Sequence, residues 1–165
     1  MNLKKTIFSV IALFMLAICA TCFAGPLQAT LAQKEQAIAV AKAEVPANIN
    51  YLGIKNDEDE FEVSFQDPAT LEYYEVEVIA ATGKIKTIEI KGANTAKSAT
   101  VNQTEADIKA IVLAAYPDAQ NLVITQDTEN GLTEYEAKFT ATKFTVKLEL
   151  NPATGAICKR EHKYF

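Results

Sequence analysis

The side chains best suited to chemistry lie at residues 57–60 and near the C-terminus. Residues 57–60 read Asp-Glu-Asp-Glu, a run of carboxylates of the kind that binds divalent cations. The run lacks the alternating aspartate spacing and the glycine of a calcium-binding loop. It also lies between Ile54 and Phe61, where a turn between two strands is expected. A solvated acidic turn is our main interpretation, and a weak cation site stays open as the alternative.

Cys158, Arg160 and His162 alternate and would therefore share one face of a regular strand. Four strand residues span about 13 Å, so Cys158 and His162 are too far apart to hold one zinc ion or to act as nucleophile and base. The sequence shows no catalytic triad, metal motif or phosphate-binding loop. We therefore predict that the protein is not an enzyme and uses no cofactor.

The N-terminus has the order of a secretory signal peptide. Lys4 and Lys5 precede a nearly unbroken apolar run at residues 7–20, and small residues follow. We expect cleavage after Ala24, leaving a secreted or periplasmic protein that is not inserted in a membrane. The alternatives are cleavage after Ala20 or Ala29, lipid attachment at Cys19 or Cys22, and an uncleaved anchor.

The composition narrows the choice of partners. The chain has 21 acidic and 16 basic residues and a net charge of −5, and cleavage would remove two of the lysines. An acidic surface disfavours nucleic acid and anionic membranes as partners. Only Cys158 would survive cleavage after Ala24, so we expect no internal disulfide.

The chain repeats itself at an offset of about 72 residues. Residues 80–85 read AATGKI and residues 152–157 read PATGAI. Each stretch lies between two strand patterns, which predicts a hairpin turn whose glycine adopts positive φ. Each copy begins with a helix pattern opened by capping-box spacing, Thr30 with Gln33 and Thr104 with Asp107. The predicted inward helix residues are Ala37, Val40 and Ala41 in the first copy and Ile108, Ile111, Val112 and Ala115 in the second.

Strand patterns with a period of two follow each helix. Phe61, Val63 and Phe65 alternate with polar residues, as do Tyr74, Val76 and Val78. The second copy alternates in the same way over residues 135–139 and 144–150. One buried and one wet face argue for antiparallel sheet. We predict an α+β fold with two tandem repeats, each one helix packed on an antiparallel sheet of about four strands in a cystatin-like arrangement. The repeats are residues 30–91 and 102–165, joined by a linker at 92–101.

This pattern resembles the PepSY family. The alanine-rich helices at residues 37–43 and 106–115 and the strand-turn segments at 74–85 and 146–157 carry the resemblance. It implies a helix on an antiparallel sheet outside the cytoplasm. It also implies a role like that of the propeptides of thermolysin-like metalloproteases, which accompany and restrain a peptidase. No protease motif is present in this chain, so such an action would occur in trans.

The function expected from these observations is protein or peptide binding, with a secreted peptidase as the specific partner. The expected partner surface is an exposed sheet edge or face beside Glu72, Tyr73, Glu75 and Glu77, whose charge favours a basic partner. The aromatic residues Tyr73, Tyr74, Phe139 and Phe144 are expected mainly in the core or in cross-strand pairs. Cys158 aligns with Lys86 of the first copy, which predicts a partly exposed thiol that alkylating agents can reach. A packed or idle thiol is our main interpretation of its role, and an intermolecular disulfide or a reactive site stays open. The alternative function is an envelope domain that holds a small molecule between the two repeats.

Overall fold

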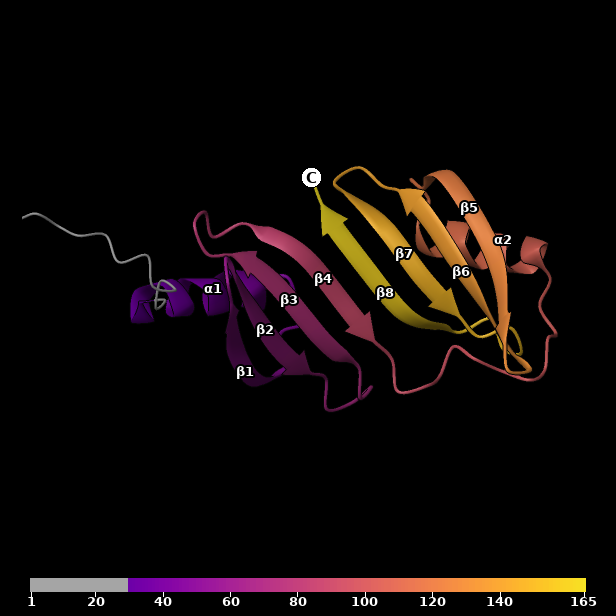
Figure 1. The fold of residues 1–165 in the computed structure, drawn as a ribbon, viewed down its shortest axis with the longest axis horizontal. Helices are drawn as coiled ribbons and strands as arrows, with labels where there is room; N and C mark the ends of the chain where they lie inside the picture. The colour runs from indigo at the N-terminus through magenta and orange to yellow at the C-terminus, as the bar shows by residue number, and fades with distance from the viewer. Residues whose placement is uncertain (1–29) are drawn as a thin grey trace, which may run out of the picture.

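The computed structural model of the chain describes residues 30–165 (Figure 1). The elements are α1 (Leu31–Ala43), β1 (Asn50–Asp57), β2 (Glu60–Gln66), β3 (Tyr73–Ile79), β4 (Ile85–Lys91), α2 (Glu105–Ala115), β5 (Gln120–Glu129), β6 (Leu132–Thr140), β7 (Phe144–Leu150) and β8 (Ile157–Tyr164). The predicted signal peptide at residues 1–24 lies outside the described residues. No helix within residues 30–165 is long and apolar enough to cross a membrane.

Both helices begin at a threonine N-cap, as the capping-box spacing predicts. Thr30 Oγ1 accepts a hydrogen bond from the Gln33 backbone N–H, and the Gln33 side chain accepts one from the Thr30 backbone N–H. Thr104 and Asp107 form the same reciprocal pair at the start of α2. Each box satisfies backbone donors that have no intrahelical partner in the first turn, so each helix start is fixed by local sequence.

One face of each helix is buried against the sheet. Ala37 and Ala41 are buried on α1, and Ile108 and Val112 are buried on α2, as predicted. Ala115 was also expected to face inward and is instead exposed, because it is the last residue of α2. The buried side chains on α1 are methyl groups, which let that helix approach its strands closely.

The strands of both repeats form one continuous antiparallel sheet in the order β1-β2-β3-β4-β8-β7-β6-β5 (Figure 1). The predicted α+β class, with four antiparallel strands after each helix, is confirmed. The strands of the two units do not interleave. The units meet where β4 pairs with β8, through a ladder that runs from Thr87↔Lys163 to Lys91↔Lys159. The last strand of each unit is therefore interior to the sheet, and β1 and β5 are its two edges.

Each unit has its own apolar core on the helix side of the sheet. The first core contains Ala37, Ala41, Phe61, Val63, Phe65, Tyr74, Val76, Val78 and Ile88. The second contains Ile108, Val112, Tyr135, Ala137, Phe139, Ala141, Val146, Leu148 and Leu150. The predicted strand alternation is thus confirmed in both copies. Because Ile88 and His162 are paired across β4 and β8 on this same side, both helices cover one face and leave the other open.

The two Thr-Gly turns adopt the conformation that their repetition predicts. Gly83 has a φ of 66° and Gly155 a φ of 75°. A Cβ atom built on Gly155 would lie 2.5 Å from the Ile111 side chain, and one on Gly83 would lie 2.8 Å from the Gln36 side chain. Each turn therefore packs against the helix of its own unit, and glycine is required both for the turn and for the close approach.

Residues 92–101, predicted as a linker, are hydrogen-bonded to the second unit. The Gly92 N–H donates to the Cys158 carbonyl at 2.7 Å, and Ser98 forms an isolated bridge with Thr133. The Asn151 side-chain amide donates to the Thr95 carbonyl at 3.0 Å. This segment, here called the strap, covers the N-terminal end of β8 around Cys158.

Candidate functional site

The sheet face opposite the helices, here called the open face, is lined by polar side chains. They alternate with the buried core residues along each strand. The open-face residues are Glu62 and Ser64 on β2, Tyr73, Glu75 and Glu77 on β3, Thr87, Glu89 and Lys91 on β4, Lys159, Glu161 and Lys163 on β8, Thr145, Lys147 and Glu149 on β7, and Glu136 and Lys138 on β6.

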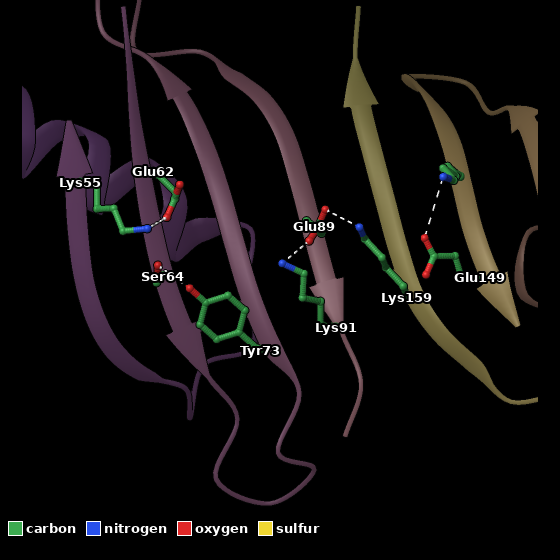
Figure 2. Close-up of polar contacts among 9 residues, drawn as sticks. Lys55, Glu62, Ser64, Tyr73, Glu89, Lys91, Glu149 and Lys159 are labelled. Carbon is green, nitrogen blue, oxygen red and sulfur yellow. Dashed lines mark hydrogen bonds and ion pairs between the residues drawn. The ribbon is translucent and has the colours of Figure 1, made fainter. Parts of the chain in front are cut away.

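Three of the four predicted partner-surface residues lie together on this face. Tyr73, Glu75 and Glu77 project from β3, which is an interior strand, so they belong to the face and not to a sheet edge. The Tyr73 hydroxyl donates to Ser64 Oγ at 2.9 Å, which gives the buried Ser64 hydroxyl a hydrogen-bond partner (Figure 2). The Lys91 ammonium lies 5.8 Å from the centre of the Tyr73 ring.

Glu72 does not join these residues. Its carboxylate accepts a hydrogen bond from Arg160 Nη1 at 3.0 Å and another from the Tyr74 hydroxyl at 3.0 Å. Tyr74 belongs to the buried core, so these bonds hold Glu72 toward the helix side. Burial, followed by the Glu72 carboxylate, raises the pKa of Tyr74 to about 12. Glu72 therefore joins β8 to the first unit, and its charge is already matched by Arg160.

The prediction of an exposed thiol at Cys158 is wrong. Its side chain is only 5% exposed, Sγ donates to the Thr95 carbonyl at 3.3 Å, and burial raises the pKa of the thiol. The alignment behind the prediction is sound, because Lys86 and Cys158 occupy the same bulge in equivalent hairpins. The difference comes from the strap, which covers Cys158, whereas no segment within residues 30–165 covers Lys86 in the same way.

Arg160 and His162 share the helix side of β8, as their alternation predicts. His162 Nε2 lies 2.8 Å from the Tyr116 hydroxyl, and its ring stacks on Phe144 with 4.8 Å between centroids. Burial and then the nearby Arg160 charge lower the pKa of His162. This histidine packs at the C-terminal end of α2, an arrangement that the sequence did not indicate.

The acidic run at residues 57–60 forms the turn between β1 and β2, as expected. Asp57, Glu58 and Asp59 are exposed, and Glu58 has a φ of 43°. Across residues 30–165, no group of three or more His, Cys, Asp or Glu side chains is arranged to hold a metal ion.

Three open-face carboxylates lie directly opposite one another on adjacent strands. Glu75 pairs with Glu89 across β3 and β4, and Glu89 pairs with Glu161 across β4 and β8. Like charges in directly opposed positions destabilise a sheet. Glu89 is compensated by Lys91 at 2.5 Å and Lys159 at 2.9 Å (Figure 2). Burial raises the pKa of Glu89, but hydrogen bonds from these two ammonium groups bring it below its usual value.

Glu75 and Glu161 have no such compensation. Within residues 30–165, neither makes an ion pair at 4.0 Å or less. Burial and the neighbouring Glu62 carboxylate raise the pKa of Glu75. Lys163, on the same face, likewise has no ion-pair partner among these residues. The sequence offered no means to find Glu161 and Lys163, because their positions depend on the pairing of β4 with β8.

The open face has two adjoining hollows. The smaller has a volume of about 270 Å³, and its charged lining residues are Glu75, Glu77, Lys86, Glu89, Glu161 and Lys163. The larger has a volume of about 490 Å³, and its polar lining residues are Asn121, Lys138, Thr140, Thr145, Lys147, Glu161 and Lys163. The two hollows share Glu161 and Lys163. The larger volume falls within the range typical of small-ligand sites.

The two sheet edges provide a different kind of surface. An edge strand leaves a row of backbone N–H and C=O groups without sheet partners. β5 is ten residues long and β1 eight, and each has one irregularity in its pairing. Each also carries an exposed apolar side chain, with Val123 57% exposed on β5 and Leu52 53% exposed on β1.

Comparison with known protein families identifies a domain within the second unit. Residues 103–161 match the PepSY family model, described as "Peptidase propeptide and YPEB domain". Residues 103–161 form a PepSY domain. The search of curated proteins and the search of solved structures found no match.

The PepSY domain contains α2, β5, β6, β7 and most of β8. The first unit lies outside the matched residues but has the same order of one helix and four antiparallel strands. PepSY domains are typically non-catalytic, and no catalytic family is matched. The edge strand β5 therefore belongs to the PepSY domain, whereas the smaller hollow lies where the two units meet.

Proposed function

We propose that this protein is an exported, non-catalytic binding module that pairs the free edge of β5 with an extended segment of a protein partner. The specific partner we propose is a secreted peptidase, which the module restrains in trans. The observation that carries the proposal is that β5 belongs to the PepSY domain and, among residues 30–165, is the longest strand and is paired on one side only.

Pairing at an edge follows from backbone chemistry. An added strand satisfies the free N–H and C=O groups of the edge, and nearby side chains then select among segments. Val123 provides apolar contact area on β5, and Thr125 and Asp127 provide exposed polar contacts. The acidic character of the chain favours a basic segment through faster encounter.

A pair of matched substitutions tests this proposal. Val123→Lys places a charge on the β5 edge, and Leu52→Lys makes the same type of change at the comparably exposed position on β1. The measurement is the activity of a thermolysin-like metallopeptidase with increasing amounts of each protein. We expect inhibition by the wild type and by Leu52→Lys, and at least tenfold weaker inhibition by Val123→Lys. Equal potency of all three proteins, or no inhibition by the wild type, would reject the β5 proposal.

A second candidate function is a small-ligand or sensory role, and the smaller hollow specifically favours it. This hollow draws residues from β3 and β4 of the first unit and from β8 of the second, so a ligand there would contact both units. The test is a thermal-shift screen with small charged molecules. A ligand at about 100 times its Kd would stabilise the fold by about 2.7 kcal/mol. No shift with any charged compound would remove this candidate.

A further inference from the structure

The two repeats differ systematically on the open face. Strand pairing matches eight open-face positions of the first unit with eight of the second. Written in order, the matches are Glu62 with Glu136, Ser64 with Lys138, Tyr73 with Thr145, Glu75 with Lys147, Glu77 with Glu149, Thr87 with Lys159, Glu89 with Glu161 and Lys91 with Lys163. Four of these matches keep the sign of the charge, and three place a lysine only in the second unit.

These three lysines polarise the face. At the matched positions the first unit has four carboxylates and one ammonium, and the second has three carboxylates and four ammonium groups. The central row across the sheet reads Glu75, Glu89, Glu161, Lys147 and Lys138. Carboxylates thus gather at the smaller hollow and ammonium groups at the larger one.

Charged groups without an ion-pair partner within residues 30–165 line the two hollows. Glu75 lines the smaller hollow, and Lys163 lines both. Neither has an ion-pair partner within residues 30–165, whereas Glu89 has two, Lys91 and Lys159. The groups free to meet a ligand are therefore the Glu75 carboxylate at one end, the Lys163 ammonium at the other, and the Glu161 carboxylate two residues before Lys163 on β8.

We propose that the open face binds a short linear peptide with free termini, whose ammonium group contacts Glu75 and whose carboxylate contacts Lys163. Glu161, which lines both hollows, adds a further carboxylate between the two ends. The Thr145 hydroxyl, which lies opposite Lys163 in the strand pairing, adds a hydrogen-bond donor at the second end, where the Lys147 ammonium is already paired with Glu136 at 2.6 Å. The inference rests on the second candidate function and names its ligand class. Its two contact residues lie on β3 and β8 and not on the β5 edge, although Asn121 and Val123 of β5 also line the larger hollow.

The distance between the two ends sets the length of the peptide. Glu75 and Lys163 lie two strand spacings and one two-residue step apart, which places their Cα atoms about 12 Å from each other. An extended chain covers about 3.3–3.6 Å per residue. The separation therefore fits a peptide of three or four residues, and longer peptides cannot present both termini while remaining extended between these ends.

The test is a titration of the isotope-labelled protein with tetra-alanine, followed by NMR. We expect saturable shifts at Glu75, Glu161 and Lys163. N-acetyl tetra-alanine and tetra-alanine amide should each bind about threefold to fivefold more weakly, because each loses one ion pair. Hexa-alanine should show no advantage over either blocked peptide.

Two variants test which residue contacts each terminus of the peptide. Glu75→Gln should weaken binding of tetra-alanine about threefold to fivefold and leave N-acetyl tetra-alanine unaffected. Lys163→Gln should do the same for the free peptide and leave the amide unaffected. Glu149→Gln and Lys55→Gln are the matched controls, because both residues are charged and line neither hollow, and their binding should equal the wild type.

Equal binding of free and blocked peptides, or shifts confined to the β5 edge, would overturn the inference. Binding of the amide as tight as the free peptide would show an acidic site only and would also overturn it. If no peptide binds but another charged compound shifts the melting temperature, the inference fails while the second candidate function stands.

Discussion

At the scale of single residues, the chemistry of Cys158 is set by what covers it. The strap buries the thiol and accepts its hydrogen bond through the Thr95 carbonyl. Burial raises the pKa of the thiol, and only the thiolate is a good nucleophile. We predict that iodoacetamide leaves Cys158 unmodified in the native protein at neutral pH and modifies it fully in concentrated urea. Peptide mass spectrometry of both samples measures this. Stoichiometric labelling of the native protein would mean that the strap does not hold its position.

His162 makes stability depend on pH. Burial and the Arg160 charge lower its pKa in the folded protein, whereas the unfolded value is about 6.5. Between these two values the unfolded state binds more protons than the folded state. The contribution of His162 to stability is therefore present above about pH 6.5 and is lost as the pH falls below it.

The check is urea unfolding of the wild type and His162→Gln at a series of pH values. The wild type should lose stability relative to the variant as the pH is lowered from about 7.5 to about 5. Carboxylates titrate in both proteins, so the difference isolates His162. A difference that is constant across the range would contradict the predicted direction of the pKa shift.

At the scale of elements, each Thr-Gly turn is fitted to its own helix. Replacing glycine by alanine at a positive φ lowers the free energy of unfolding by about 1–2 kcal/mol. Gly131→Ala should show this backbone strain alone, because nothing lies within 4 Å of the added Cβ. Gly155→Ala should cost about 1–3 kcal/mol more, because the Cβ would meet Ile111, which packs against the second core. Gly83→Ala should fall between them, since the Gln36 side chain can move.

Urea unfolding of the three variants measures this order. A loss of stability in Gly155→Ala no larger than in Gly131→Ala would show that the turn does not press on α2. The same comparison tests whether the repeated sequence at residues 80–85 and 152–157 has one structural cause in both copies.

The elements differ in how far their sequences reveal them. The capping boxes and the alternation in β2, β3, β6 and β7 are local patterns, so both helices and the interior strands could be predicted. β1 and β5 contain no fully buried residue, and only Ile54 on β1 and Leu122 and Ile124 on β5 pack against the cores, so their period-two signal is short. The open-face site depended on strand order as well, because Glu75 and Lys163 approach only through β4 and β8.

At the scale of the whole molecule, the join between the units is the feature that no local pattern predicts. β4 and β8 pair with each other in place of ending as two free edges. Arg160 on β8 bonds to Glu72 of the first unit at 3.0 Å, and Tyr164 on β8 packs against the first core. The last strand of the PepSY-containing half therefore contributes to both cores. A unit of this size alone would bury only about 60% of its unfolded surface, so each half gains from the other.

The two halves should therefore unfold together. Leu148 is fully buried in the second core, and Leu148→Ala should destabilise that core by about 2–5 kcal/mol. If β8 must stay in place for the first unit to persist, the amides of β3 should lose protection against hydrogen exchange by the same free energy. Hydrogen exchange read separately on β3 and β6 makes the comparison, and a wild-type sample supplies the reference. Unchanged protection of β3 in Leu148→Ala would show that the units fold independently, despite the continuous sheet. In a cooperative molecule, a ligand bound across the open face would stabilise both units together, because it would bind only when β4 and β8 are paired.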